Sequence, residues 1–354
     1  MDVEEDFDSL INETVPESTK KSTVWGTKVF DDYCKRNDIK VDFHSITEEE
    51  FAEILKRFYA NIRKKNGQLY SPSALVGIRS ALHRMITSPP FARTVNIIQG
   101  ANFVAANRIF TAKCKVFTAR GNPKPQHKAQ INQADMQKLG DYFKDFSESP
   151  QKLLQYVWFG LCYYFGRRGR EGWRDLTKSS FTLKVDEENH EFLAENTTMR
   201  TKNHQGGPKA EENDYSDPRI YDVTFLQGYK AYVGKLHESC DSFFQTPRAD
   251  WSRKDNCWYK NMPLGQHTIH NLMAKISKGA NLSQTYTPHC VRASMISILF
   301  KSGVQPKEIC QITKHKNENS LNSYINGSSS AQKRTCSKIL GEALNKQVKN
   351  PKNA

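Results

Sequence analysis

The sequence Thr287-Pro288-His289-Cys290-Val291-Arg292 places an imidazole and a guanidinium three residues apart. In a helix that spacing is about one turn, so His289 and Arg292 would share a face. A plain amphipathic helix has the same spacing, and the four-residue pattern His-x-x-Arg occurs by chance in many proteins. Its meaning therefore depends on the residues around it.

Other polar side chains flank this stretch in the chain. His315 and Tyr324 follow it nine residues apart, and Arg168 and Lys202 precede it. A guanidinium fits the non-bridging oxygens of a phosphodiester and stays charged, so two of them stabilise a pentacoordinate transition state without a metal. Tyrosine attacks phosphorus once a base removes its proton, because a free phenol has a pKa near ~10. His289 or Lys202 could act as that base, and either could protonate the departing 5′ oxygen.

Three more motifs accompany these side chains. Residues 166–171 read Gly-Arg-Arg-Gly-Arg-Glu, residues 200–202 read Arg-Thr-Lys, and residues 314–315 read Lys-His. In this order, and with Tyr324 last, the set resembles the tyrosine recombinases, and within them the animal Crypton-type DNA transposon enzymes. The resemblance extends from about Ser22 to Leu340. Lysine at position 314 is a departure, because glycine usually precedes the histidine.

The resemblance implies a role for each residue. Arg168 is the first catalytic arginine in a G-x-R-x-x-E box, with Glu171 supporting it. Lys202 is the hairpin lysine, which protonates the leaving oxygen. His289 assists proton transfer, and Arg292 is the second arginine that clamps the phosphate. His315 hydrogen-bonds the phosphate, and Tyr324 is the nucleophile.

The implied activity is DNA breaking and rejoining without metal, ATP or any other cofactor. Tyr324 attacks one strand, forms a 3′-phosphotyrosine and releases a 5′-hydroxyl, and a 5′-hydroxyl of a partner strand reverses the step. Family members act as tetramers on paired sites, linked by exchange of a C-terminal segment, for which we expect residues 336–344. The expected role is integration or excision of a mobile element, in the nucleus.

Alternative interpretations remain for the function and for each residue. The chain could be a domesticated DNA-binding or chromatin protein without catalysis, or a topoisomerase-type relaxing enzyme. Arg168 could be a surface arginine, with Arg170 as the fallback, and Lys202 a solvated lysine. His315 could cap a helix and Tyr324 could belong to a core. Each of these explanations is plausible singly, but together they require a coincidence at six positions.

The charge distribution favours a polyanionic partner. The 354 residues carry a formal net charge of +14 and a pI of 9.3. Residues 1–18 hold seven acidic side chains and no lysine or arginine, so the remaining residues carry +21. This footprint predicts binding to double-stranded DNA, with the acidic segment 1–18 as a disordered tail. We expect DNA contacts from a group of cations in the N-terminal half: Arg63, Lys64, Lys65, Arg79 and Arg84.

The eight cysteines favour neither disulfides nor a metal site. They form no Cys-x-x-Cys motif and follow no signal peptide, so we expect reduced thiols in an intracellular protein. Cys257, His267 and His270 lie close in sequence but lack a fourth ligand with zinc-finger spacing, so we predict no metal site. No apolar run approaches the ~18 residues of a membrane span, so we expect no membrane role.

The patterning predicts an α+β protein, mainly α, with two domains. Four amphipathic helices are expected at 22–37, 51–62, 71–86 and 101–110, the second beginning after a capping box at Thr47. Further helices are expected from Asn132 or Gln133 and from Pro150, the latter ending near Arg168. Strands at 181–185 and 191–194 flank a turn, and the later chain is mainly helical. The predicted organisation is an acidic tail (1–18), a helical core-binding domain (19–115), a linker (116–131), a catalytic domain with a small antiparallel sheet (132–345) and a basic tail (346–354).

Overall fold

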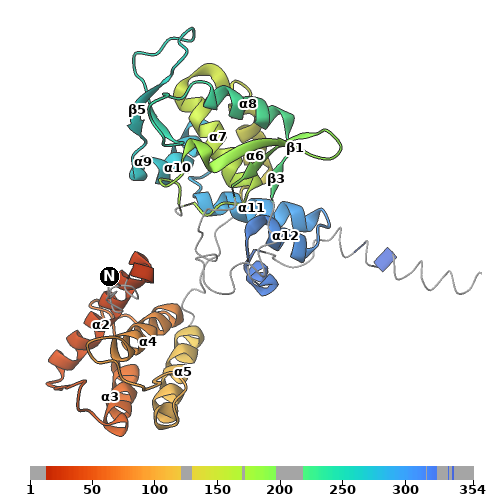
Figure 1. Ribbon diagram of the computed structural model, residues 1–354. Coiled ribbons are helices and arrows are strands. Elements are labelled where there is room, and N and C mark those ends of the chain that lie inside the picture. The colour runs from red at the N-terminus through yellow and green to blue at the C-terminus, as the bar shows by residue number, and fades with distance from the viewer. Residues whose placement is uncertain are drawn as a thin grey trace, which may run out of the picture. The chain divides into compact units, whose positions relative to one another are not determined.

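The computed structural model describes residues 13–120, 130–169, 172–196, 218–315 and 317–324, together with 334, 337 and 338. The chain divides into two compact units, Met1–Pro125 and Gln126–Ala354 (Figure 1). The division falls within the predicted linker, and each unit has its own cluster of buried apolar side chains. The units are described separately below.

The first unit is a small helical bundle. Its long helices are α2 (Glu17–Arg36), α3 (Glu48–Asn61), α4 (Pro72–Thr87) and α5 (Val104–Ala119), the last preceded by the 3-10 turn η1 (Ala101–Phe103). Helix α2 packs on α4, α3 packs on α5, and α4 also contacts α5 (Figure 1). The core between them is rich in aromatic rings, such as Phe30 and Phe58, whose centroids lie 5.1 Å apart.

The sequence explains where these helices begin. The Thr47 hydroxyl accepts a hydrogen bond from the Glu50 backbone N–H at 3.2 Å, and the Glu50 carboxylate accepts one from the Thr47 N–H at 3.1 Å. This confirms the predicted capping box, which satisfies two of the backbone donors exposed at the start of α3. The Ser71 side chain caps the start of α4 by accepting from the Ala74 backbone N–H, and Pro72 lies in the first turn.

Two helix boundaries in this unit differ from the prediction. Helix α2 begins at Glu17, five residues earlier than expected, because Pro16 is compatible with the position before a helix and Glu17 suits its first turn. Helix α5 continues to Ala119, past the expected end at Phe110 and into the predicted linker. The stretch 111–119 contains neither glycine nor proline to stop the helix.

The second unit is mainly helical, and α7 (Pro150–Tyr164) lies near its centre (Figure 1). Helix α7 packs against α8 (Val223–Val233), α10 (Leu272–Gly279) and α11 (Pro288–Lys301). The other elements are α6 (Gln133–Phe143), α9 (Gln266–His270), α12 (Pro306–Thr313) and the 3-10 turns η2 (Phe146–Glu148), η3 (Lys178–Ser180) and η4 (Glu318–Ser323).

A three-stranded antiparallel sheet, ordered β1-β2-β3, lies beside these helices. Strand β1 (Phe181–Val185) pairs with β2 (Glu191–Glu195) in the register Phe181↔Glu195, and β2 pairs with β3 (Arg219–Ile220). This confirms the predicted strands and the mainly helical α+β class. A second sheet, of β4 (Gln245–Pro247) and β5 (Tyr259–Pro263), was not anticipated within the part expected to be mainly helical.

None of the helices in the described ranges is both long enough and apolar enough to cross a lipid bilayer.

Candidate active site

The loop after α7 brings Arg168 to the N-terminal end of α11. Gly166 has φ +55°, a conformation that suits glycine, and Trp173 donates from its indole N–H to the Arg168 carbonyl at 2.9 Å. A Cβ added to Gly169 would lie 1.9 Å from Cβ of Pro288, so the loop and α11 are closer than any side chain at position 169 would permit. The absence of a side chain at Gly169 therefore allows the two predicted motifs to lie close together.

Arg292 lies on a helix that is buried nearly all round, and the residue itself is 2% exposed. Its Nη1 donates to the carbonyl of Gly166, and its Nη2 donates to the carbonyl of Thr313 at 2.6 Å. These contacts connect α11 to the Arg168 loop and to the end of α12. They hold the guanidinium in place and compensate for its burial.

His315 contacts the same guanidinium, with Nε2 3.1 Å from Nη2 of Arg292. Its Nδ1 lies 2.7 Å from the Thr313 hydroxyl, which itself donates to the Ile309 carbonyl at 2.6 Å. Because the hydroxyl has a single proton, it must accept from Nδ1–H of His315. That assigns the Nδ1–H tautomer, with Nε2 accepting from Arg292.

The electrostatic surroundings keep His315 neutral. Burial is the largest cause, followed by the electrostatic influence of Arg292, Arg168 and His289 in that order, and together they lower the pKa of His315 to about 3. The effect of Arg168 and His289 on this ring also shows that both residues lie near it, although they come from different parts of the chain. Neutral His315 is thus surrounded by the predicted phosphate-binding groups.

Tyr324 lies at the end of η4, beside both histidines. Its phenol oxygen is 3.4 Å from Nε2 of His289, and its ring centroid lies 5.6 Å from that of His289 and 5.9 Å from that of His315. A phenol next to an exposed imidazole is the geometry of a nucleophile with its proton acceptor. Both groups come from one chain.

The lysine that replaces the usual glycine before His315 adopts a glycine-like conformation. Lys314 has φ 55° and ψ 41°, the left-handed conformation in which a helix commonly ends with glycine, and which costs other residues roughly 1 kcal/mol. Its Nζ lies 2.9 Å from Oε2 of Glu195, whose Oε1 accepts from Arg167. The lysine thus retains the turn and adds a partly buried ion pair.

The segment that opens the described part of the second unit contacts the site at three places. Gln130 donates from its side-chain amide to the Tyr324 carbonyl at 3.1 Å, and the Ile131 backbone N–H donates to the Ser294 hydroxyl at 2.7 Å. Buried Asp135 accepts from the Ser283 N–H at 3.0 Å and from the Tyr286 hydroxyl at 2.8 Å. Residues 130–135 therefore hold the nucleophile, α11 and the loop before it.

The structure brings five of the six predicted catalytic residues together: Arg168, His289, Arg292, His315 and Tyr324. Lys202, Glu171 and the fallback Arg170 lie outside the described residues, as does most of segment 336–344. The sequence did not point to Thr313, Glu195 or Gln130. Of these, only Glu195 had a possible signal, since a lysine in place of the turn glycine needs an anionic partner if its side chain becomes buried.

The cations predicted to contact DNA from the bundle differ in their surroundings. Lys64 and Lys65 are exposed, whereas Arg79 donates to the Asn107 amide oxygen at 2.8 Å and lies 4.0 Å from the Phe110 ring centroid. Arg84 donates to the Thr23 hydroxyl at 2.8 Å, and Arg63 to the Ile62 carbonyl at 2.9 Å. These contacts stabilise the bundle, and a DNA-binding role for each cation stays a prediction.

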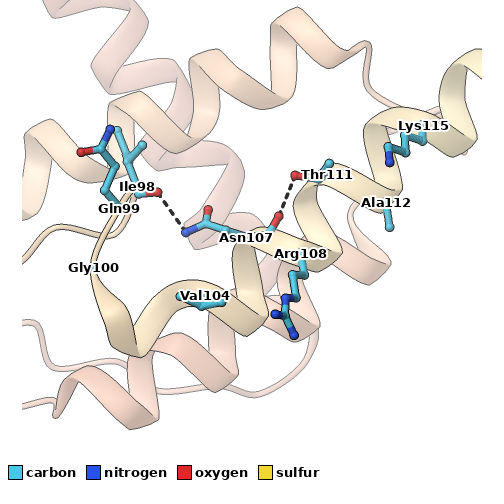
Figure 2. Close-up of a pocket in the computed structure, with 9 residues that line it drawn as sticks. All are labelled: Ile98, Gln99, Gly100, Val104, Asn107, Arg108, Thr111, Ala112 and Lys115. Atoms are coloured by element: carbon cyan, nitrogen blue, oxygen red, sulfur yellow. Dashed lines mark hydrogen bonds between the residues drawn. The ribbon is translucent and has the colours of Figure 1, made fainter.

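A shallow groove of about 470 Å³ follows the outer face of α5 (Figure 2). Asn107 donates to the Ile98 carbonyl at one wall of the groove, and the exposed cations Arg108 and Lys115 lie along the helix. Because Arg108, Thr111 and Lys115 are spaced at three and four residues, they share one side of α5. This basic strip adds two cations to those predicted from the sequence.

Within the described ranges, no group of three or more His, Cys, Asp or Glu side chains is arranged to hold a metal ion. The thiol of Cys257, one of the zinc candidates considered above, donates to the Tyr259 carbonyl at 3.1 Å.

Comparison with known proteins identifies the fold. Residues 236–330 match the model of the phage integrase family, and residues 137–278 match a domain of unknown function, DUF3504. The Tn1549 transposon integrase in complex with transposon right end DNA aligns with a TM-score of 0.52 at 14% identity, over 92% of this chain and 95% of that chain. The fold is therefore that of the tyrosine recombinases.

Two curated relatives are named as uncharacterised proteins. The human uncharacterized protein KIAA1958 is 19% identical over 291 residues, which make up 79% of this chain and 40% of that protein. Its homologue from Mus musculus is 18% identical over the same shares. The chain thus spans about 40% of the length of these relatives.

Proposed function

We propose that this protein cleaves and rejoins DNA at specific sites through a 3′-phosphotyrosine formed by Tyr324. The observation that carries the proposal is the 3.4 Å approach of the phenol oxygen to Nε2 of His289, beside the Arg292–His315 pair. A core tyrosine or a helix-capping histidine would not require this combination. The recombinase fold and the match to the phage integrase family support the same chemistry.

The cleavage step follows from these positions. The phenol proton passes to His289 as the Tyr324 oxygen forms a bond to phosphorus, and the bond from phosphorus to the 5′ oxygen breaks. Arg168 and Arg292 stabilise the charge that develops on the non-bridging oxygens. Lys202, by family resemblance, delivers a proton to the 5′ oxygen. Rejoining reverses each transfer, with a 5′-hydroxyl as the nucleophile.

His315 participates after a change of protonation. As the Nδ1–H tautomer it accepts a hydrogen bond from Arg292 and has no proton on Nε2 to offer a phosphate. A bound phosphate introduces negative charge beside the ring, which raises the pKa of His315 and favours a proton on Nε2. His315 then donates to the phosphate.

Double-stranded DNA is the proposed partner, bound mainly through its phosphates. The net charge of +14 supports a salt-dependent interaction, and exposed cations such as Lys64, Lys65, Arg108 and Lys115 are available on the bundle. The Tn1549 integrase in the comparison was solved with DNA. We place this protein with the Crypton-type enzymes, acting in the nucleus as a tetramer on paired ends of a mobile element.

The test is covalent capture on nicked suicide substrates carrying candidate element termini. Purified protein and the variants Tyr324→Phe and Tyr221→Phe are incubated with them in EDTA, and the products are separated under denaturing conditions. Tyr221 is a partly exposed tyrosine of the same unit and serves as the matched control. The expected result is an adduct formed by the wild type and Tyr221→Phe and lost in Tyr324→Phe. Salt-sensitive binding without an adduct on such a terminus would instead support a non-catalytic DNA-binding protein.

A further inference from the structure

Glu195 is a buried acid at the end of strand β2, with a side chain 4% exposed. One carboxylate oxygen accepts from Arg167, and the other lies 2.9 Å from Nζ of Lys314. The Lys314 side chain is 19% exposed, so both ion pairs lie largely out of water. A single carboxylate thus joins cations that are 28 and 119 residues away in the sequence.

Each of these cations precedes a residue of the proposed active site. Arg167 is bonded to Arg168, and Lys314 is bonded to His315. Adjacent Cα atoms are about 3.8 Å apart, so fixing one residue restricts the next. Arg168 lies in the loop after α7 and His315 lies just beyond α12, outside regular helix or strand. The carboxylate is therefore a cross-link between two loops, which Arg292 also connects through the carbonyls of Gly166 and Thr313.

We infer that Glu195 is a positioning residue, which sets the location of Arg168 relative to His315 through its ion pairs with Arg167 and Lys314. This inference rests on the proposed function. Removing the charge from Glu195 takes away the anion that lies between Arg167 and Lys314, so the repulsion between these two cations increases in a partly dry environment. The loops then separate, and the phosphate-binding groups move with them.

The ion pair between Glu195 and the turn before His315 depends on the lysine at position 314. A glycine there would form the same left-handed turn but would have no side chain to reach Glu195. With lysine, the position of the turn depends on the carboxylate. Glu195 and Lys314 are therefore expected to be energetically coupled, and substitutions at both positions should be non-additive.

The experiment measures single-turnover cleavage of a suicide substrate, DNA affinity and the NMR signal of the His315 imidazole. The variants are Glu195→Gln, Lys314→Gly and their combination. The control is Glu191→Gln on the same strand, because Glu191 pairs with Lys230 at 2.6 Å on the surface. Lys314→Gly is compatible with the backbone at φ 55°, so it is expected to fold even if Glu195→Gln does not.

The expected result is a cleavage rate lower by about 10- to 100-fold in Glu195→Gln, comparable to misplacing a catalytic group by about 1 Å. The DNA affinity should stay within about 3-fold, because most phosphate contacts with the duplex are proposed to come from cations away from this site. Lys314→Gly should lower the rate by about 5-fold and add little in the Glu195→Gln background. Glu191→Gln should match the wild type.

Three results would overturn the inference: an unchanged cleavage rate in both single variants, additive effects in the double variant, or a rate loss fully explained by weaker DNA binding. If the wild type forms no adduct, the proposed function fails, and the His315 signal decides the inference separately. A shift of that signal in Glu195→Gln and Lys314→Gly but not in Glu191→Gln supports positioning. An unchanged signal contradicts it.

Discussion

The phenol oxygen of Tyr324 and Nε2 of His289 lie 3.4 Å apart in the same chain, although 35 residues separate them in the sequence. The spacing permits a hydrogen bond that shortens as the tyrosine loses its proton. Neither side chain needs a second copy of the protein to meet the other. The proposed nucleophile and its proposed base are therefore supplied by the same subunit.

Loss of the His289 imidazole is expected to slow cleavage without weakening DNA binding. A positioned general base contributes on the order of 100-fold or more, so His289→Gln should form the covalent adduct at least that much more slowly. Single-turnover assays on a suicide substrate measure this rate. His267→Gln, at another exposed histidine, serves as the control. Equal rates for both variants would remove His289 from the mechanism.

The His315 ring is expected to stay neutral between about pH 5 and 8 in the free protein, because its pKa is lowered to about 3. In the unfolded chain it titrates near ~6.5, so the unfolded state binds the extra proton and this group destabilises the fold as the pH falls from about 6.5 towards 3. The chemical shift of the imidazole C–H, assigned with His315→Asn, should not change between about pH 5 and 8. Bound DNA should make the signal titrate at higher pH. A titration near pH 6.5 in the free protein would contradict the described geometry.

Arg292 is expected to contribute to stability as well as to catalysis. In Arg292→Met the carbonyls of Gly166 and Thr313 lose a buried donor, which should lower the free energy of unfolding by about 2–4 kcal/mol. Urea denaturation measures the change. Arg174→Met is the matched control, because Arg174 is exposed and contacts Ser242 at 3.4 Å. Equal stability of the two variants would mean that the Arg292 contacts contribute little.

The glycine at position 169 is expected to be required for a functional site. In Gly169→Ala the new methyl group overlaps Pro288, so the Arg168 loop and α11 must separate. Cleavage should fall on the order of 100-fold, the penalty for a displacement of about 1 Å. Gly140→Ala provides the control, since its Cβ would meet nothing within 4 Å and alanine favours the helix. Normal cleavage by Gly169→Ala would show that the loop adapts freely.

The stabilising effect of Asp135 should disappear in acid. Hydrogen bonds from the Ser283 hydroxyl, followed by the Ser283 backbone and Tyr286, lower the pKa of Asp135 to about 2 despite its burial. A lowered carboxyl pKa stabilises the fold above about pH 4, and this contribution is lost as the pH falls through 2. The stability difference between wild type and Asp135→Asn should therefore shrink below about pH 3, as measured by urea denaturation across pH. A difference independent of pH would exclude the ionised carboxylate as its source.

Local patterns were sufficient to predict much of the fold. The capping box at Thr47 and the turn at residues 186–190 involve neighbours in sequence, so their residue types predict them directly. Helix α5 was predicted too short, with an end at Phe110, whereas the following residues, which include neither glycine nor proline, continue the helix to Ala119. The β4–β5 sheet was missed because both strands are short and their register is irregular.

The candidate site was only partly predictable, because local patterns do not reveal contacts between residues far apart in the sequence. His289, Arg292 and Tyr324 have distinctive residue types and an order that the family resemblance interprets. The role of Glu195 depends on partners 28 and 119 residues away, which no local periodicity can indicate. Gln130 is still further from its partner, the carbonyl of Tyr324, at 194 residues. Such supporting contacts become visible only when the chain is folded.

The contacts of residues 130–135 have a consequence for dividing this protein into pieces. The match to DUF3504 begins at residue 137. A fragment cut there would retain Arg168, Arg292 and Tyr324 but would lose Gln130 and Asp135, which hold the tyrosine's carbonyl and the loop before α11. The part of the chain that the two family models match, residues 137–330, therefore omits contacts that hold the proposed site, and dissection at residue 137 would separate the proposed reactive groups from part of their framework.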